Sequence, residues 1–376
     1  MVCSTFTIFG QQTKSMINAD DALSKVATGL SLLRRPSTGF SDILELGIRD
    51  LQALSLIYEN KSLPTSRFDL LSIMETPLQE WWSGPLPNCE KDDVLLRFGE
   101  ATSFCMEWAY SLRDLNAQMN EIDERLMKKI IDICRSDRSG YYPLYLNSRR
   151  FIIERPVVRL KEIIDQASKG NILSEVQDAY EPVPTECIEN GSVYLCHYCH
   201  DAMIIKDDHL YCRNWIICEH HGDFSKRHVI QFTADLRRLR RGMKAYVCIP
   251  GLPEIGLNSK LVKLKLDSSL WPGIDEYDLH LRLPNGKVWA VDVKATRSPW
   301  VLGKREAEKG FIQQFDSPGL HWDRAFYVIA NEFFSSRYER LFWDGAKSAG
   351  STKRKINLLS VKQFLQIVRR EIEEYA

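Results

Sequence analysis

Residues 271–294 read Trp-Pro-Gly-Ile-Asp-Glu-Tyr-Asp-Leu-His-Leu-Arg-Leu-Pro-Asn-Gly-Lys-Val-Trp-Ala-Val-Asp-Val-Lys, and this stretch decides the fold of the chain. Two short runs of alternating polarity flank Asn285 and Gly286, a dipeptide that is typical of a β-hairpin turn. Alternate residues of a strand point to the same face, so each run has one apolar face. The apolar positions are Leu279, Leu281 and Leu283 in the first run and Trp289, Val291 and Val293 in the second.

The register of this hairpin follows from the need for both apolar faces to meet one core. A three-residue loop at 284–286, with Gly286 in the left-handed conformation, satisfies that need. It pairs Leu281 with Trp289, so both strands present their apolar side chains to the same side. The sequence therefore predicts the strand pairing as well as the turn.

The same register sets two carboxylates next to each other. Asp278 lies directly opposite Asp292, with Lys294 two residues further along the same face. Two adjacent carboxylates are destabilising unless something positive lies between them. We therefore predict that a divalent metal ion binds between Asp278 and Asp292.

Length and composition indicate a soluble protein of two or three domains. The chain has 376 residues, of which 44% are apolar and 27% charged, ordinary values for a globular protein. Basic and acidic residues number 50 each, so the net charge indicates no partner. No apolar run approaches the ~20 residues of a membrane helix, and the N-terminus lacks a signal-peptide pattern. Ten cysteines favour free thiols or metal binding over disulfides, and we expect a cytoplasmic protein.

The composition and residue patterns of the sequence divide the chain into three regions. The first is mostly helical and carries no catalytic pattern, so no function is predicted for it. An acidic, proline-containing stretch at 175–186 is interpreted as a linker between this region and a cysteine-rich zinc ribbon, which an α/β domain follows. The predicted boundaries are 1–185 for the helical region, 190–225 for the zinc ribbon and 226–376 for the α/β domain.

Four cysteines in the second region have the spacing of a structural zinc site. A Cys-x-x-Cys knuckle places two thiolates on one turn, and the run after it reads as strand, turn and strand, which returns the second pair to the first. Four thiolates leave a tetrahedral zinc ion no open position, so this Zn²⁺ would be structural. The predicted ligands are Cys196, Cys199, Cys212 and Cys218.

The identity of the fourth ligand stays open. Five residues separate Cys212 from Cys218, where zinc ribbons usually have two. His197, His220 or His221 could therefore replace Cys218.

A basic segment follows at 236–244. Leu236, Leu239 and Met243 keep helical spacing, which predicts an amphipathic helix. In a chain without net charge, such a cluster of cations indicates a contact with the phosphate backbone of DNA. The predicted DNA-binding residues are Arg237, Arg238, Arg240, Arg241 and Lys244.

The last region alternates between strands and helices. Val262, Leu264 and Leu266 alternate in a candidate first strand, and the hairpin supplies the second and third. A continuous apolar run at 325–330 predicts a buried strand. The other expected elements are helices at 300–315, 335–346 and 361–375 and a strand at 356–359.

Asp278, a spacer of thirteen residues and then Asp292-x-Lys294 on a hydrophobic strand resemble the PD-(D/E)xK superfamily of nucleases. The resemblance implies an α/β (α+β) fold with a restriction-endonuclease-like core in the order α-β-β-β-α-β. It implies that Asp278, Asp292 and the carbonyl of Val293 bind Mg²⁺ or Mn²⁺, which would polarise the scissile phosphate. Lys294 would orient the attacking water and stabilise the charge that develops on the phosphate.

The acidic ligands depart from the superfamily pattern in one respect and stay open in another. Tyr277 precedes Asp278 where proline is expected, and Asp275 is a competing first acid. We prefer Asp278, with Asp275 as a possible partner of a metal-bound water. Many members also use a glutamate on the preceding helix, and of the two candidates, Glu254 and Glu276, we prefer Glu254.

Residues 190–300 as a whole resemble the restriction-endonuclease-like (REase) family that accompanies pPIWI-RE. The cysteine ribbon, the arginine-rich segment, Pro250-Gly-Leu-Pro-Glu254 and the hairpin carry this resemblance. It implies a Mg²⁺-dependent deoxyribonuclease, an endonuclease of a prokaryotic defence island against phages or plasmids. Its partners would be DNA, a Piwi-like protein and a helicase. The alternatives are a catalytically inactive DNA-binding or scaffolding subunit, and a resolvase or transposon-end nuclease on the same fold.

Overall fold

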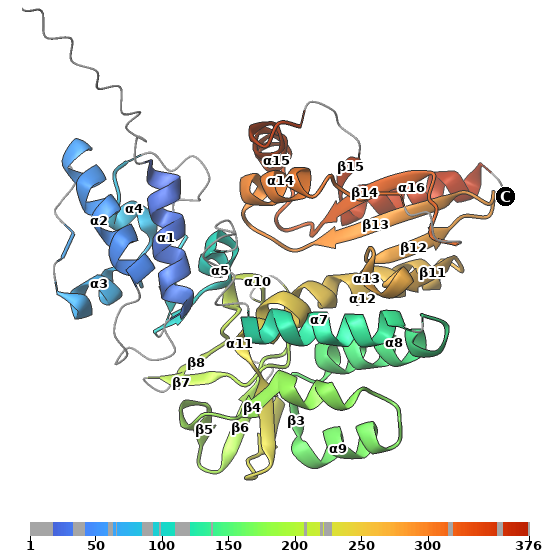
Figure 1. Ribbon diagram of the computed structural model, residues 1–376, viewed down its shortest axis with the longest axis horizontal. Coiled ribbons are helices and arrows are strands. Elements are labelled where there is room, and N and C mark those ends of the chain that lie inside the picture. Colours follow the sequence, from blue (N-terminus) through green and yellow to red (C-terminus); the bar gives the residue numbers. More distant parts are fainter. Residues whose placement is uncertain are drawn as a thin grey trace, which may run out of the picture.

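The structure is a computed structural model, in which the protein is a mixed α/β chain of helices and small sheets (Figure 1). No helix within the described ranges is both long and apolar enough to cross a lipid bilayer. The described residues are 18–32, 42–58, 63–64, 66–84, 93–97, 99–109, 121–136, 138–206, 209–218, 221, 228–314, 319–351 and 356–374.

The largest sheet lies in the C-terminal third and has five strands in the order β11-β12-β13-β14-β15. The first three strands pair antiparallel, whereas β13, β14 and β15 pair parallel. The strands are β11 (Asp267–Leu270), β12 (Leu279–Arg282), β13 (Val288–Lys294), β14 (Arg324–Ile329) and β15 (Asn357–Ser360).

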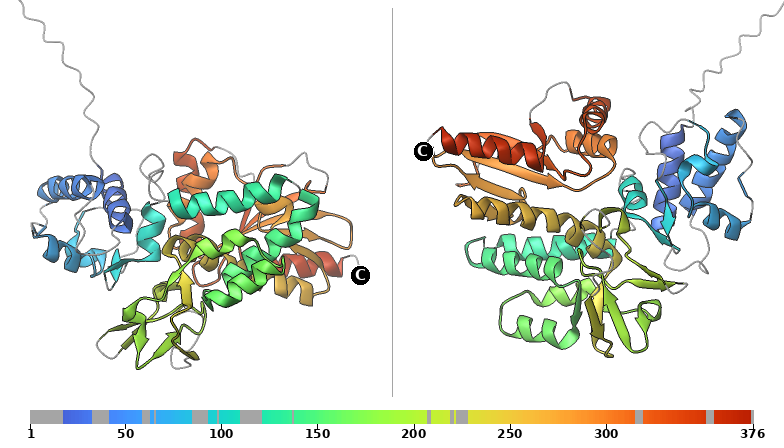
Figure 2. Two further views of the ribbon diagram at one scale, coloured as in Figure 1. Left: turned by 60° about the horizontal axis from the view of Figure 1, so that its bottom comes forward. Right: turned by 180° about the vertical axis from the view of Figure 1, so that it is seen from behind.

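Helices cover both faces of this sheet (Figure 2). One pair of helices is α12 (Ile249–Lys263) and α16 (Val361–Glu373), and the other is α14 (Pro299–Glu308) and α15 (Ser336–Ser348). The first pair packs on the face that presents Trp289 and Phe326, and the second pair packs on the face that presents Ala290 and Tyr327.

The predicted hairpin is confirmed in its register and its turn. Leu281 pairs with Trp289, and the amide of Leu283 donates to the carbonyl of Lys287 at 2.9 Å to close a three-residue loop. Gly286 has a φ of +80°, the left-handed conformation that a side chain would disfavour. The period-2 pattern decides this result because only one register puts both apolar faces into the core.

The first strand of the sheet is not where the alternation of Val262, Leu264 and Leu266 predicted it. Helix α12 continues to Lys263, and β11 begins only at Asp267. Val262 is 52% exposed on the outer side of the helix. A short apolar run fits a helix as well as a strand, and in this protein the run begins as the last turn of α12.

The predicted basic helix at 236–244 is wrong over its first half. Residues 236–239 form strand β10 (Leu236–Leu239), the middle strand of the sheet β3-β10-β4. Leu236 and Leu239 lie three residues apart, which suits a helix, but on this strand they fill two different cores. The neighbouring elements are β3 (Val157–Arg159), β4 (Tyr180–Pro182), α11 (Arg241–Met243) and the π-helix η4 (Lys244–Cys248), which leads into α12.

The acidic stretch at 175–186 is not a linker. It forms the 3₁₀ helix η1 (Ser174–Ala179), strand β4 and the 3₁₀ helix η2 (Thr185–Cys187). Val176, Ala179 and Tyr180 are buried in the core that α12 also enters. The apolar residues between the acids therefore fix this stretch to the body of the protein.

Two groups of helices precede it. The first has its own core, in which Trp81 and Trp82 are buried. The second, α7 and α8, packs along α12, as Figure 1 shows. The elements are α1 (Ala19–Leu32), α2 (Asp42–Ile57), α3 (Arg67–Ile73), α4 (Leu78–Trp81), β1 (Leu96–Arg97), β2 (Glu100–Ala101), α5 (Ser103–Ala109), α7 (Glu121–Ser136), α8 (Arg138–Glu154) and α9 (Leu160–Ser168).

The cysteine-rich part contains two small sheets. β7 and β8 pair antiparallel between the two halves of the cysteine pattern, which confirms the predicted strand, turn and strand. β9 pairs back onto β6, so the strand after residue 226 belongs to the sheet of the cysteine-rich part. The elements are β5 (Ile188–Glu189), β6 (Ser192–Leu195), β7 (Ile204–Lys206), β8 (His209–Tyr211), α10 (Trp215–Cys218) and β9 (His228–Gln231).

The contact between α14 and α15 gives a test of the fold. A Cβ on Gly303 would overlap the carbonyl oxygen of Phe342, whereas a Cβ on Gly256 of α12 would meet open space. We expect Gly303→Ala to destabilise the protein by roughly 1–3 kcal/mol because the two helices would have to separate. Gly256→Ala should be neutral or stabilise by about 0.5–1 kcal/mol. Thermal unfolding measures both, and a Gly303→Ala variant as stable as the wild type would contradict this packing.

Candidate active site

The end of the hairpin brings Asp278 and Asp292 together. The amide of Asp278 donates to Asp292 Oδ1 at 3.1 Å, and the amide of Val293 donates to Asp278 Oδ2 at 2.7 Å. The carboxylates thus continue the hydrogen bonding beyond the last strand pair, Leu279 with Val291. Both side chains are largely buried, with 13% and 14% of their surface exposed.

Lys294 lies beside both carboxylates. Its Nζ is 3.2 Å from Asp292 Oδ2 and 4.0 Å from Asp278 Oδ2, and it sits 5.5 Å from the ring centre of Tyr327. Burial alone would lower the pKa of this lysine, but the charges of Asp292 and Asp278 outweigh it and raise the pKa. Lys294 is therefore a cation in the folded protein and can donate hydrogen bonds.

Burial disfavours the charged form of both carboxylates. It raises the pKa of Asp278 well above its usual range, and the charges of Glu254 and Asp292 raise it further. Burial also raises the pKa of Asp292, against the opposing effect of Lys294. A cation bound between them would reverse this effect, because it favours the charged form of both groups.

The donor atoms at this point suit a hard divalent ion. Among the hydrogen bonds of the described residues, the one that the Asp278 carboxylate accepts engages Oδ2 and leaves Oδ1 for a cation. The amide of Val293 faces the side where β12 has ended, and its carbonyl faces the same side because a residue in a strand directs both groups alike. Carboxylate and carbonyl oxygens are the ligands that magnesium and manganese prefer.

Glu254 enters the same site from α12. Its side chain is 3% exposed, it accepts a hydrogen bond from Trp271 Nε1, and its Oε2 lies 3.2 Å from Arg149 Nη2. The stretch Pro250-Gly-Leu-Pro-Glu254 lies in the first turns of this helix.

Asp275 lies apart from the paired carboxylates. It accepts a hydrogen bond from Arg149 and belongs to the loop that includes the short helix α13 (Pro272–Asp275). This loop has left-handed backbone at Trp271, Ile274 and Asp275, with φ of 49°, 63° and 68°. Each such residue costs about 1–3 kcal/mol and persists only where its surroundings hold it.

Glu306 and Tyr327, which lie behind Lys294, were not predicted from the sequence. Glu306 of α14 is buried and accepts a hydrogen bond from Tyr327 at 2.9 Å. Burial raises its pKa, but Lys294 and Arg305 together with that hydrogen bond lower the pKa to about 2. Glu306 is therefore an anion that stabilises the charge on Lys294. No local sequence signal marks it, because it meets Lys294 only through the packing of α14 on the sheet.

A cavity of about 600 Å³ opens onto these groups. Its size is typical of a ligand-binding site. Its walls combine six acids with four cations, which suits a metal ion that bridges to an anionic substrate. The charged residues of this wall are Glu254, Asp275, Glu276, Asp278, Asp292, Glu306, Arg149, Lys294, Arg305 and Lys309.

The structure divides the predicted DNA-binding residues. Arg238 is 5% exposed and its Nε lies 3.1 Å from Glu181, so it is not a surface contact. Lys244 is 2% exposed, and its Nζ donates to the carbonyl of Cys199 at 2.8 Å. Both predictions are wrong, because one arginine pairs with a neighbouring strand and the lysine faces the cysteine cluster. Arg237, Arg240 and Arg241 are only half-buried, so a DNA contact by these three stays a prediction.

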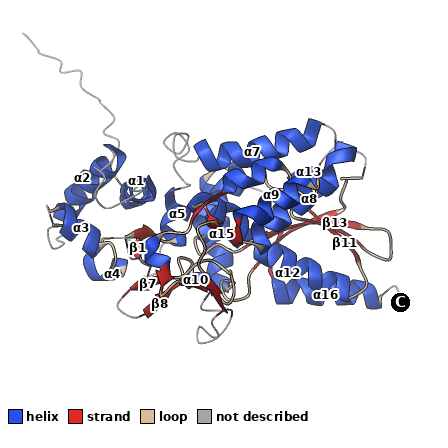
Figure 3. Cartoon of the chain, turned by 90° about the horizontal axis from the view of Figure 1, so that it is seen from below, coloured by secondary structure: helices blue, strands red, loops and turns tan. Residues whose placement is uncertain are grey.

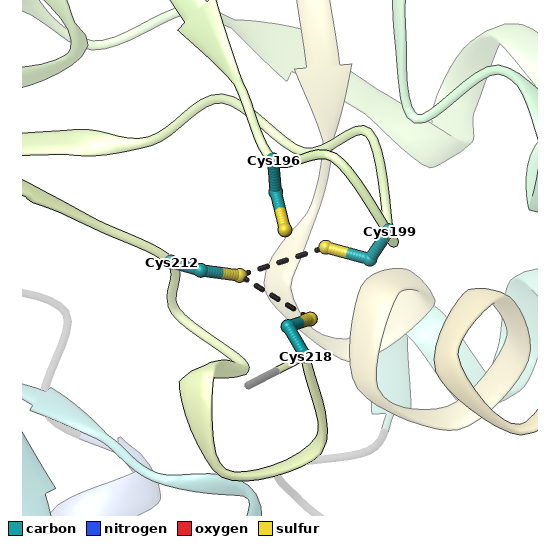
Figure 4. Close-up of side chains that lie close together, drawn as sticks. All are labelled: Cys196, Cys199, Cys212 and Cys218. Carbon is teal, nitrogen blue, oxygen red and sulfur yellow. Dashed lines mark hydrogen bonds between the residues drawn. The ribbon is translucent and has the colours of Figure 1, made fainter. Parts of the chain in front are cut away.

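The four predicted cysteines lie together (Figure 4). Their sulfur atoms are all within 4.8 Å of one another, and all four residues are buried. The Cys212 Sγ is 3.6 Å from the sulfurs of Cys199 and Cys218. Four thiolates at this spacing fit a tetrahedral zinc ion, and the buried ammonium of Lys244 lies where it offsets their negative charge.

Among the residues that the structure describes, the cluster includes Cys218 and no histidine. His221 stacks on Tyr198 with ring centres 4.0 Å apart, and its Nε2 lies 2.7 Å from Glu332. His220, the other alternative in this turn, lies outside the described residues. The five-residue spacer therefore still returns Cys218 to the cluster, through the short helix α10.

Two segments of the chain match known family models. Residues 251–376 match the family model described as REase associating with pPIWI_RE. The C-terminal third of the chain is therefore similar to this REase family, for which PD-(D/E)xK is the broader superfamily. Residues 50–159 match a second model, described as pPIWI_RE three-gene island domain Y. Searches of curated proteins and of solved structures gave no match.

The REase match covers the five-stranded sheet and contains Glu254, Asp278, Asp292 and Lys294. The cysteine cluster lies before it. The domain Y match ends after α8 and contains Arg149, in a region for which the sequence had predicted no function. The candidate site therefore combines residues from both matched segments.

The cysteine cluster predicts a zinc content. Purified wild-type protein should hold about one zinc ion per chain, and Cys212→Ser should lose most of it because three thiolates bind less tightly than four. Cys105→Ser is a matched control, because Cys105 is equally buried but lies in the separate core of the N-terminal helices. Elemental analysis by mass spectrometry measures the zinc. A wild type without zinc, or equal zinc in both variants, would refute the site.

Proposed function

We propose that this protein is a Mg²⁺-dependent DNA endonuclease that works with the other products of a pPIWI-RE three-gene island in defence against foreign DNA. One observation carries the proposal. Asp278 and Asp292 lie side by side, with Lys294 in contact with Asp292, within the segment that matches the REase family. The printed descriptions of the two matching families support the link to such an island.

The order of elements supports a restriction-endonuclease-like core. Apart from the short helix α13 between β11 and β12, α12 is followed by β11, β12 and β13 and then by α14 and β14, which fits the order α-β-β-β-α-β. The antiparallel hairpin carries the two aspartates, and the parallel strand β14 follows after a helix. The two aspartates lie at the end of this hairpin, where both line the cavity.

The metal ion would be held by Asp278, Asp292 and the carbonyl of Val293. When bound, it would polarise the scissile phosphate and lower the pKa of a water molecule beside it. Glu254 lies near enough to Asp278 to influence its pKa and would hold a water of the ion. These ligands leave positions open for a phosphate oxygen.

Lys294 would act on the substrate as a charged donor and not as a base. Its pKa is raised, so it keeps its proton at neutral pH. Its ammonium would orient the attacking water and stabilise the negative charge that grows on the phosphate in the transition state. Glu306 and Tyr327 would keep this ammonium in place from behind.

The cations at the mouth of the cavity would contact the DNA backbone. Arg305 and Lys309 of the α14 segment line the cavity beside the acids. Arg237, Arg240 and Arg241 would add contacts outside it, and the zinc-bound cysteine cluster would hold this part of the chain in shape. Binding should therefore weaken as salt increases.

The proposal is tested by one substitution with a matched control. Asp292→Asn should reduce Mg²⁺-dependent DNA cleavage at least about 100-fold and leave DNA binding largely intact, because it removes a metal ligand but no contact with the backbone. Asp267→Asn should leave cleavage unchanged, because that carboxylate lies on the same sheet but is 76% exposed. Cleavage is measured on linear and branched DNA with Mg²⁺ or with a chelator.

The outcome separates the alternatives. Equal cleavage by Asp292→Asn and the wild type would overturn the assignment of the site. A wild type that binds DNA but cleaves none with Mg²⁺ or Mn²⁺ would support a DNA-binding or scaffolding subunit. A strong preference for branched DNA or transposon ends would support a resolvase or transposon-end nuclease.

A further inference from the structure

Three side chains of α7 and α8 reach the loop before Asp278. Arg149 donates to Asp275 and Glu254, Arg135 donates twice to the carbonyl of Ile274, and the Tyr142 hydroxyl donates to the carbonyl of Leu270 at 2.6 Å. Figure 3 shows both helices beside α13, which is part of this loop. A segment that precedes the REase match by about a hundred residues therefore holds the approach to the candidate metal site.

Arg149 is at the centre of these contacts. Its side chain is 8% exposed, its guanidinium lies 4.6 Å from the ring centre of Trp271, and its Nη1 donates to the Tyr145 hydroxyl at 3.0 Å. The planar guanidinium can bind two carboxylates in fixed directions, which the single ammonium of a lysine cannot do. Arg149 therefore fixes Glu254 and Asp275 relative to each other.

The loop needs such support. Its left-handed residues Trp271, Ile274 and Asp275 are strained, and strained backbone persists only where other contacts hold it. The N–H of Trp271 donates to the carbonyl of Asp278 at 2.8 Å, and this hydrogen bond ties the loop to the hairpin. A shift of the loop would thus move Asp278 away from Asp292.

We propose that Arg149, with Arg135, positions the candidate metal site, so that the segment matched by domain Y completes the active site of the REase segment. This inference rests on the proposed function for its effect on cleavage. Arg149 is a positioning residue, because it acts through Glu254 and the loop that carries Asp278. It would couple any movement of α7 and α8 to the affinity of the site for metal.

The test compares Arg149→Lys with Arg150→Lys. Arg150 is the next residue of α8, and its side chain is 42% exposed beside Glu154, so it controls for the substitution itself. Arg149→Lys should weaken Mn²⁺ binding about 10–100-fold, as losses of partners around a metal site typically do. Binding is counted by electron paramagnetic resonance without DNA, after zinc has saturated the cysteine cluster. Cleavage by Arg149→Lys should be recovered in part by raising the Mn²⁺ concentration.

A second variant keeps the test clear if Arg149→Lys folds poorly. Arg135→Gln removes only the loop contacts of a side chain that is 35% exposed. It should speed hydrogen exchange in the peptide that spans 271–278 and weaken Mn²⁺ binding in the same direction. If Arg149→Lys and Arg135→Gln match Arg150→Lys in both Mn²⁺ binding and exchange, the positioning role is wrong.

The two proposals fail separately. A wild type that cleaves no DNA would refute the nuclease function, while Mn²⁺ binding and exchange would still decide whether Arg149 positions the site. A wild type that cleaves DNA, with unchanged Mn²⁺ dependence in Arg149→Lys and Arg135→Gln, would refute only the positioning role.

Discussion

Two hydrogen bonds, from the Asp278 amide to the Asp292 carboxylate and from the Val293 amide to the Asp278 carboxylate, are the constraint on which the rest of the site depends. They hold two largely buried carboxylates side by side. Buried charges need partners of the opposite sign, because the loss of hydration is otherwise not offset. Lys294 is one such partner, and the oxygen atoms that remain are suited to a metal ion.

Several parts of the chain meet that requirement together. Glu306 and Tyr327 stand behind Lys294, and Arg149 balances Glu254 and Asp275 on the opposite side. The strained loop between Trp271 and Asp278 joins these two sides. The site is therefore complete only when α8, α12, the hairpin and α14 are all in place, and its chemistry depends on packing well beyond the hairpin itself.

Local patterns in the sequence were enough for the features that a short stretch determines. The hairpin register followed from its period of two and its glycine turn, and the cysteine cluster followed from its spacing. Contacts between distant segments could not be predicted in this way. Arg149 lies 105 residues before Glu254, and nothing around it marks it as part of a site. Leu236 and Leu239 have helical spacing yet lie on a strand, where their side chains pack into two separate cores. Lys244 is basic like its neighbours, but it is buried against the cysteine cluster.

The central claim is that Asp278 and Asp292 share one divalent cation. Anomalous diffraction from crystals of the protein grown with Mn²⁺ tests it most directly. We expect a single strong peak at the end of the hairpin, in contact with Asp278, Asp292 and the carbonyl of Val293 at roughly 2.0–2.3 Å. A peak beside Asp275 instead, or no peak at this end of the sheet at saturating Mn²⁺, would contradict it.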